Sequence, residues 1–109
     1  MAYQTVNPAS NQLIKKYSPH SDKDVEAALK TADALYHSEW AKGDLGQRLP
    51  ILHRLAELID SRTEELAKIA SQEMGKLIEQ SRGEVKLCAQ IARYYADNAP
   101  RFLAPVTYK

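Results

Sequence analysis

The sequence predicts a mainly helical fold with a β-hairpin at its N-terminus. From about residue 22 to residue 98, apolar residues recur every three or four positions, which is the period of one helix face. Residues that can cap a helix stand before several of these stretches. Ahead of residue 18, two short runs that favour strands flank a cluster of turn formers. We therefore expect helices at about 22–40, 45–60, 62–75 and 77–98, and a hairpin at about 3–17.

The hairpin prediction depends on the turn between the two runs. Residues 3–6 and 13–17 each have the character of a short strand, and Asn7 and Pro8 open the segment that joins them. Pro fixes φ and Asn bonds its own backbone, so both favour a turn. Two strands alone bury too little to be stable, so the hairpin should lie on something larger.

Helix signals continue along the chain in order. Ser21 and Asp24 have the form of a capping box, and Gly43 should end the first helix. Asp44 is placed to cap the second helix, but Pro50 lies awkwardly inside it, so this helix either begins near Leu49 or has a distorted first turn. The expected apolar stripes of these two helices are Val25, Ala28, Leu29, Ala32, Leu35 and Tyr36, and then Leu45, Leu49, Leu52, Leu55, Ala56 and Ile59.

The last two helices differ in their apolar arcs. Residues 61–64 form a second capping box, and Gly75 should end the third helix. The arc of the final helix is wider, which indicates burial on more than one side. Gly83 inside this helix favours a kink or a close backbone approach, and Pro100 and Pro105 should end the helix. We expect Leu55 to be buried, so that Leu55→Ala costs about 2–5 kcal/mol if the side chain is enclosed.

Composition bounds the class of protein. The chain has 109 residues, 15 Lys and Arg against 14 Asp and Glu, three His and one Cys. One domain or a piece of one is expected at this length. Balanced charge gives no drive toward nucleic acid, and no apolar run approaches the about 20 residues of a membrane span. One cysteine excludes an intrachain disulfide, and we expect a cytoplasmic protein.

No self-contained catalytic or binding motif emerges from the residues. Cys88 lies mid-helix, where a small buried hydrophobe is the expected role. The histidines, His20, His37 and His53, lack the spacing of metal ligands. Gly75-Lys76 fails the P-loop pattern and fits a helix C-cap. We interpret the carboxylates Glu57, Asp60, Glu64 and Glu65 as solvated faces balanced by Arg54, Arg62 and Lys68, and the rings of Tyr94 and Tyr95 as core. We predict no catalytic, cofactor-binding or metal-binding residue from these patterns.

An ordered set of short segments resembles the N-terminal part of the aldehyde dehydrogenase superfamily. The segments are Val6-Asn7-Pro8-Ala9, the Ala-rich stretch running into Trp40, Gln47-Arg48, Leu52-His53-Arg54-Leu55-Ala56, Glu73-Met74-Gly75-Lys76, Arg82-Gly83-Glu84 and Arg93-Tyr94-Tyr95-Ala96. The resemblance covers essentially all 109 residues. In detail it is most similar to bacterial succinate-semialdehyde dehydrogenases.

The resemblance implies that residues 1–109 are an incomplete N-terminal part of an α/β, Rossmann-like NAD(P)-binding domain. It also implies that the family's nucleophilic Cys, general-base Glu and oligomerisation strands come later in a longer chain; Cys88 does not match the nucleophile motif. The parent would use NAD or NADP to oxidise a small aldehyde such as succinate semialdehyde, as a homo-oligomer. We expect no cofactor and no turnover for the 109 residues themselves, whose implied partner is the remainder of their own chain.

The resemblance implies a functional role for a single residue of this chain, Leu87. Counted back from Arg93, it falls where family members place a residue that lines the substrate entrance tunnel, although plain core is an equal reading. A different class remains open beside the enzyme: a stand-alone helical interaction module whose exposed apolar face binds a protein partner.

Overall fold

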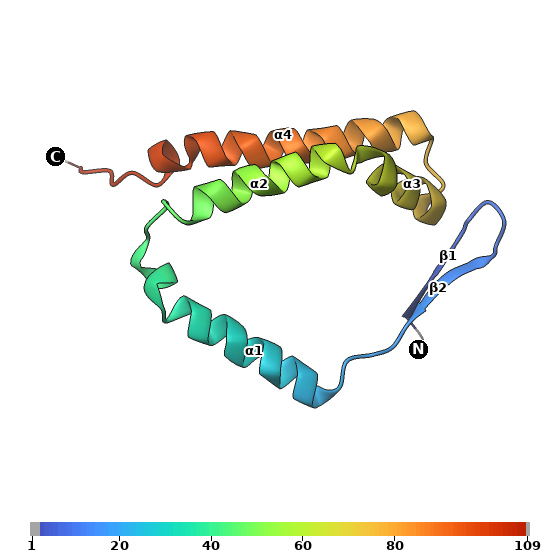
Figure 1. Ribbon diagram of the computed structural model, residues 1–109, viewed down its shortest axis with the longest axis horizontal. Helices are drawn as coiled ribbons and strands as arrows, with labels where there is room; N and C mark the ends of the chain where they lie inside the picture. Colours follow the sequence, from blue (N-terminus) through green and yellow to red (C-terminus); the bar gives the residue numbers. More distant parts are fainter. Residues whose placement is uncertain (1–2, 109) are drawn as a thin grey trace. The chain divides into compact units, whose positions relative to one another are not determined.

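The computed structural model describes residues 3–108. In chain order the elements are β1 (Tyr3–Val6), β2 (Leu13–Tyr17), α1 (Asp22–Tyr36), the 3₁₀ helix η1 (Glu39–Lys42), α2 (Arg48–Ser61), α3 (Thr63–Met74) and α4 (Ile78–Phe102) (Figure 1). The predicted class, mainly helical with an N-terminal hairpin, is confirmed. The described chain divides into two compact units, residues 3–44 with 73–75, and residues 45–72 with 76–108.

Hydrogen bonds within the loop stabilise the hairpin of the first unit. β1 and β2 pair antiparallel, with Tyr3 opposite Tyr17, and the register shifts after Thr5. The Asn7 side-chain oxygen accepts the Ala9 N–H at 2.9 Å, and the Asn7 N–H donates to the Gln12 carbonyl at 2.9 Å. These bonds satisfy the loop backbone locally, which is why the turn formers predicted the hairpin correctly.

The hairpin loop contacts the residues that end α3. Gly75 has a left-handed backbone, with φ of +69°, and a Cβ built on it would lie 3.0 Å from Pro8 Cγ. Glycine is therefore required here both by the backbone conformation and by the proline ring. The prediction that Gly75 ends the third helix is confirmed.

α1 begins as predicted and ends earlier. Ser21 Oγ accepts the Asp24 N–H, and the Asp24 carboxylate accepts the Ser21 N–H at 3.0 Å, which completes the capping box. The helix stops at Tyr36 rather than near residue 40, because Ser38 bonds the Leu35 carbonyl at 2.6 Å and caps a separate 3₁₀ turn. Gly43 closes that turn with φ of +78°.

α2 begins at Arg48, so the expected start at residue 45 is wrong. The Leu45 carbonyl accepts the Arg48 and Leu49 N–H groups at 3.0 Å in a turn that precedes the helix. Pro50 then lies in the first turn, where a missing N–H breaks no intrahelical bond. Of the two readings of Pro50, the start near Leu49 is the correct one.

The break between α2 and α3 falls at Arg62, and the expected capping box is wrong. The Ser61 hydroxyl donates to the Leu58 carbonyl at 3.0 Å, and the Thr63 hydroxyl donates to the Asp60 carbonyl at 2.8 Å. Both hydroxyls therefore finish the preceding helix instead of starting the next one.

α4 continues through Pro100 to Phe102, so the expected end near residue 98 is also wrong. A proline in the last turn removes a single backbone bond, and the Leu103 N–H donates to the Ala99 carbonyl at 2.9 Å just beyond it. At Gly83 an added Cβ would meet no atom within 4 Å, so the expected close backbone approach is absent there.

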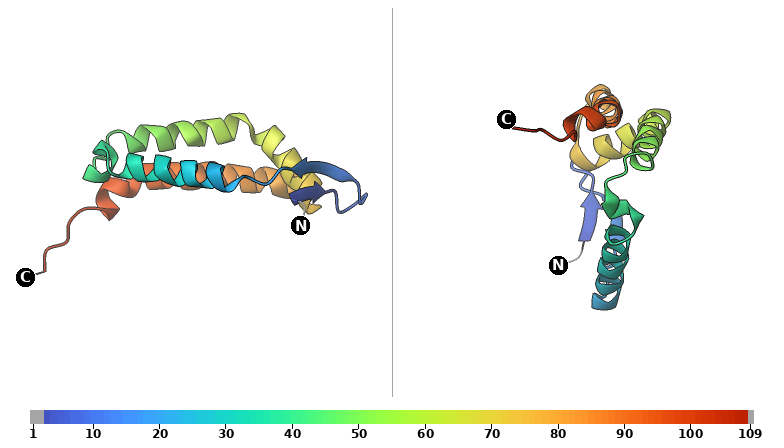
Figure 2. Two further views of the ribbon diagram at one scale, coloured as in Figure 1. Left: turned by 90° about the horizontal axis from the view of Figure 1, so that it is seen from below. Right: turned by 90° about the vertical axis from the view of Figure 1, so that its left-hand side faces the viewer.

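The core of the second unit is built from small side chains. α2 and α4 lie side by side and antiparallel, as both views show (Figures 1 and 2). The buried residues are Ala56, Ala67, Ser81, Ala89, Ala92 and Ala96. Ser71 and Ser81 join α3 to α4 through a 3.0 Å hydroxyl contact. Leu55 is 47% exposed, so its predicted burial is wrong: alanines form the contact and the bulky residue lies outside it.

None of the helices in residues 3–108 combines the length and the apolar character needed to cross a membrane.

Candidate functional site

The residues with nucleophilic or metal-binding chemistry are dispersed. Cys88 is exposed on α4, so its predicted burial is wrong. His37 pairs with Asp33 at 3.3 Å on α1, and His53 pairs with Asp97 at 3.4 Å between α2 and α4. Within residues 3–108, no cluster of three or more His, Cys, Asp or Glu side chains could hold a metal ion.

The paired carboxylates are engaged in surface ion pairs. Arg54 pairs with Glu57 at 2.9 Å and Arg62 with Glu65 at 2.6 Å, as the interpretation of solvated faces expected. Hydrogen bonds from Arg62 lower the pKa of Glu65 below its usual value. Carboxylates held ionised by arginine are poor proton donors near neutral pH.

Arg82 joins α3 to α4. Its Nε and Nη2 donate to the two Glu64 carboxylate oxygens at 2.7 and 2.8 Å, and Nη1 bonds Glu79. The bonds from Arg82 lower the pKa of Glu64, and the bonds to Glu64 and Glu79 raise the pKa of Arg82. This bidentate arrangement links α3 to α4.

Interhelical ion pairs mark one side of the α2–α4 pair, which we call the polar face. Arg93 bonds Asp60, and His53 approaches Asp97. Successive helix residues turn by about 100°, so these α4 residues share a sector with Lys86, Gln90 and Arg101. The alanines occupy a second sector, against α2.

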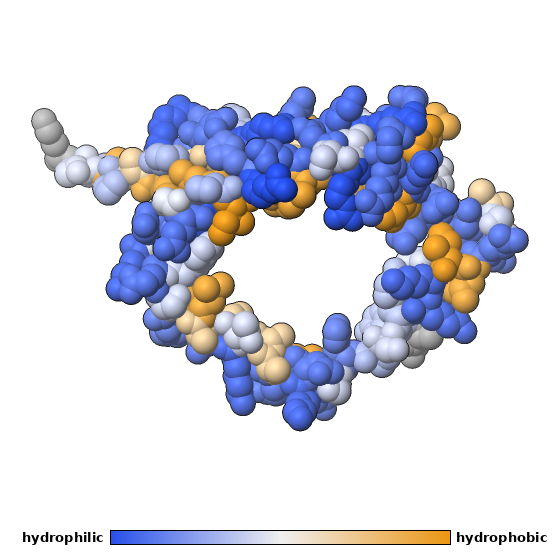
Figure 3. Space-filling view, viewed as in Figure 1, coloured by the Kyte–Doolittle hydropathy of each residue, from blue (hydrophilic) through white to orange (hydrophobic). Residues whose placement is uncertain are grey.

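The third sector of α4 carries large nonpolar side chains. Rotation by about 100° per residue places it on the side of the helix pair opposite the polar face, together with a matching sector of α2. We call this surface the apolar face; its members are Ile51, Leu55 and Leu58 of α2 and Leu87, Ile91, Tyr94, Tyr95 and Phe102 of α4, each between 41% and 58% exposed. Figure 3 shows hydrophobic surface along the lower edge of this helix pair.

The tyrosines belong to an aromatic cluster on the apolar face. The ring centroids of Tyr94 and Tyr95 lie 5.5 Å apart, and Phe102 lies 5.9 Å from the first and 6.4 Å from the second. Edge and tilted contacts of this kind stabilise aromatic groups against one another. The expectation that both rings lie in the core is wrong within this chain, because about half of each side chain is exposed.

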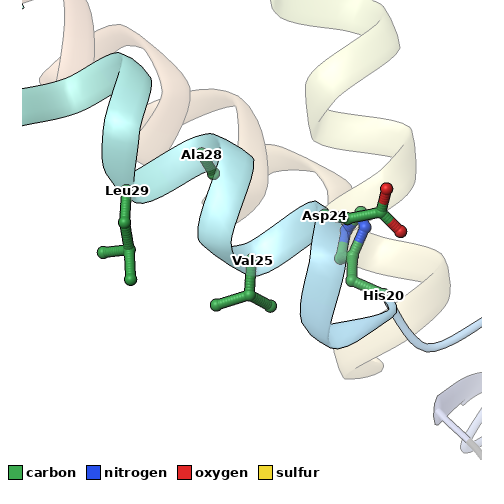
Figure 4. A pocket seen from close by; sticks show the side chains of 5 residues that line it. All are labelled: His20, Asp24, Val25, Ala28 and Leu29. Atoms are coloured by element: carbon green, nitrogen blue, oxygen red, sulfur yellow. The ribbon is translucent and has the colours of Figure 1, made fainter. Parts of the chain in front are cut away.

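Two concave surfaces of the described chain each follow a single helix. One lies along α1, where Val25 and Leu29 project from the same side of the helix, with His20 and Asp24 at its N-terminal end (Figure 4). Ala28 completes the lining, and all five residues come from one short stretch of chain. A second groove runs along α2 between Pro50 and Leu58. Neither gathers polar groups from separate elements, as substrate pockets do.

Leu87, the predicted tunnel residue, lies at the edge of the apolar face. It is 52% exposed on α4, one turn before Ile91.

One contact was missed by sequence reasoning. Pro8 and Gly75 come from two separate segments of the family resemblance, and the structure brings them together. A signal was present, since one segment carries a proline with a fixed φ and the other a glycine that can adopt a left-handed backbone, but nothing in the sequence pairs residues 67 positions apart in the chain.

Comparison with known proteins places these features in a family. The family model described as the aldehyde dehydrogenase family matches residues 1–108. The chain is 38% identical over 105 residues to a succinate-semialdehyde dehydrogenase [NADP(+)] of Deinococcus radiodurans, covering 96% of this chain and 22% of that protein. It is 36% identical to a probable enzyme of the same name from Synechocystis, covering 95% and 23%.

A solved structure agrees in fold. The crystal structure of succinic semialdehyde dehydrogenase from Streptococcus pyogenes, in complex with NADP+, matches with a TM-score of 0.90 and 37% identity, over 99% of this chain and 24% of that one. The chain thus spans between a fifth and a quarter of the length of these relatives and matches the N-terminal part of their fold. On the family match over residues 1–108 and on this structural agreement, the chain belongs to the aldehyde dehydrogenase family.

Proposed function

We propose that the chain is the N-terminal segment of an NAD(P)-dependent succinate-semialdehyde dehydrogenase, a part of its coenzyme-binding domain. The observation that carries this proposal is the 38% identity to the Deinococcus enzyme over 96% of the chain. The names of that relative and of the Synechocystis protein favour NADP over NAD as the coenzyme.

The residues present do not fit a dinucleotide. A phosphate cradle needs glycines ahead of a helix N-terminus, where backbone N–H groups point at the anion. Gly43 and Gly75, the glycines with left-handed backbones, instead follow helix C-termini, where carbonyl groups disfavour negative charge. Coenzyme contacts therefore belong to polypeptide outside these residues, and we derive no catalytic step from this segment.

The role proposed for the segment is structural support and one wall of the substrate passage. The helices of the second unit supply a packed layer, and Leu87 stands at its edge. Under this proposal Leu87 lines the path by which the aldehyde reaches a catalytic centre built by later polypeptide.

A chimera tests the proposed activity. Residues 3–108 replace the matching segment of the Deinococcus enzyme, and oxidation of succinate semialdehyde is followed by formation of NADPH. We expect turnover comparable to that of the unaltered enzyme, within about tenfold. A folded chimera that oxidises other small aldehydes but not succinate semialdehyde would contradict the substrate assignment.

Leu87→Trp in the same chimera tests the passage. A bulky ring in the path should raise KM or lower kcat/KM by about tenfold or more while the thermal midpoint stays unchanged. Gln90→Trp is the matched control, because Gln90 lies on the same helix in the exposed polar sector. Equal kinetics for both variants would remove Leu87 from the passage.

A further inference from the structure

An ion pair joins the loop between α3 and α4 to the second turn of α4. Lys76 lies in that loop, two residues before α4 begins, and its Nζ donates to the carboxylate of Glu84, eight residues further along the chain. The two side chains are 35% and 55% exposed, so the pair lies at the surface. Surface ion pairs contribute little to stability, so fold stability gives only a weak reason for this one.

The pair lies next to Leu87. Glu84 precedes Leu87 by three residues on α4, and residues three apart on a helix are neighbours on one side, with Cβ atoms about 5–6 Å apart. Leu87 is itself about half exposed. The Glu84 carboxylate therefore stands beside the side chain that we propose as a wall of the substrate passage.

The other cations near the start of α4 face α3. Arg82 donates to both carboxylate oxygens of Glu64. Hydrogen bonds from Arg82 lower the pKa of Glu64, and the charge of Lys86 adds to this effect, which places Lys86 on the α3 side as well. Within residues 3–108, the ion-pair partner of Glu84 is Lys76. The charge of Glu84 is thus balanced by a loop residue and not by the cations of its own helix.

The proposed substrate is an anion. Succinate semialdehyde carries a carboxylate at the end opposite its aldehyde group, and a carboxylate is ionised at neutral pH. An unbalanced Glu84 carboxylate beside the passage would repel this charge, and walls of low dielectric strengthen such repulsion. Lys76 removes the repulsion by neutralising Glu84. A neutral aldehyde carries no such charge and gains nothing from Lys76.

We propose that Lys76, through its pair with Glu84, is a specificity-determining residue that favours entry of carboxylate-bearing aldehydes into the passage beside Leu87. Lys76 acts on the charge of its partner and takes no part in the chemical step. This inference rests on the proposed function, since it requires Leu87 to border the passage of an aldehyde dehydrogenase.

Lys76→Gln in the chimera that carries residues 3–108 tests the proposal. We expect kcat/KM for succinate semialdehyde to fall by about three- to tenfold, and kcat/KM for butanal, a neutral aldehyde of the same carbon number, to change by less than about twofold. Added salt should reduce the loss, because ions screen the exposed carboxylate. Lys86→Gln is the matched control: it removes the same charge from the α3 side of α4 and should leave both values within about twofold.

Two further variants separate charge from structure. Lys76→Arg keeps the positive charge and should keep the preference for the anionic aldehyde. Lys76→Gln combined with Glu84→Gln removes both charges and should return kcat/KM to within about twofold of the unaltered chimera. The thermal midpoints of all variants should stay within about 2 °C of the chimera, as expected for a surface ion pair.

Several outcomes would overturn the proposal. Equal losses on both aldehydes would give Lys76 a structural role alone. An unchanged kcat/KM in Lys76→Gln, or a double variant as impaired as the single one, would exclude charge neutralisation. A chimera that oxidises glutaric semialdehyde but not succinate semialdehyde contradicts the proposed substrate alone, and the comparison with butanal then uses that anionic aldehyde. A chimera that oxidises only neutral aldehydes contradicts both proposals.

Discussion

At the scale of single residues, the glycine that ends α3 and the glycine inside α4 should respond oppositely to substitution by alanine. Gly75 has a φ of +69° and lies against Pro8, whereas Gly83 sits inside α4 with open space around its Cα. A side chain at the first position meets strain and a neighbour, while at the second it meets solvent and only limits the freedom of the unfolded chain.

Gly75→Ala should therefore destabilise the fold by roughly 1–2 kcal/mol from the backbone alone, with further loss from the Pro8 contact. Gly83→Ala, the control, should stabilise by about 0.5–1 kcal/mol. Urea unfolding followed by circular dichroism measures both changes. A loss at Gly75→Ala no larger than this backbone cost would show that Pro8 does not lie on Gly75 in solution, and equal effects of the two variants would contradict the left-handed backbone at Gly75.

Leu55 and Ala56 are adjacent in sequence but differ in burial, so their substitutions should differ in their effect on stability. Leu55 is about half exposed and Ala56 is fully buried against α4. Leu55→Ala should cost less than about 1 kcal/mol in the 109-residue chain, well below the range for an enclosed leucine. Ala56→Leu should cost about 1–3 kcal/mol, because extra methylenes force the helices apart. A larger cost for Leu55→Ala would mean that its stripe is covered in solution.

At the scale of elements, α1 depends on its cap. No residue of α1 is buried, so its formation rests on local bonds rather than on tertiary packing. The Ser21–Asp24 box supplies these bonds, and hydrogen bonds from Ser21 lower the pKa of Asp24 below its usual value of 3.8.

The sign of the pH dependence follows from that direction. A lowered pKa in the folded state means that the ionised carboxylate stabilises the helix above pH 3.8 and that this contribution is lost as the pH falls through the folded value. We expect α1 helicity to drop below about pH 4, and Asp24→Asn to remove that drop. Asp22→Asn is the control, since Asp22 lies outside the box; circular dichroism against pH would contradict the assignment if both variants titrate alike.

At the scale of the whole chain, most of the large nonpolar side chains are exposed rather than buried in the core. The buried positions are alanines and a serine, and the bulky residues lie on the apolar face. Alanine burial contributes little transfer free energy, so the packing of α2 against α4 is weakly stabilised for its length. Such a chain is expected to unfold with low cooperativity and to expose a site for hydrophobic dyes.

The 109-residue chain should therefore bind 1-anilinonaphthalene-8-sulfonate at neutral pH, whereas the folded chimera should not. It should also give no NADPH from succinate semialdehyde, because no residue of the segment serves as nucleophile or base in our proposal. Fluorescence titration and a coenzyme assay check the two expectations. A monomeric chain that melts cooperatively and binds no dye would instead favour the stand-alone interaction module.

Sequence alone determined the elements of this protein, since their signals are local. The Asn7 turn and the Ser21 cap act through bonds within a few residues, the Gly75 end acts through its own left-handed backbone, and each was predicted correctly. The same patterns misplaced the start of α2 and the end of α4, where Pro50 and Pro100 are tolerated within a first and a last turn.

Only the tertiary structure decided which nonpolar residues are enclosed. A period of three to four residues shows that a helix has an apolar side, but not which part of that side meets a partner. Between α2 and α4 the small alanines allow close approach, so Leu55 and Ile91 remain outside the contact. The same geometry gathers those bulky residues into one continuous face, because burial depends on how two helices rotate against each other rather than on either sequence by itself.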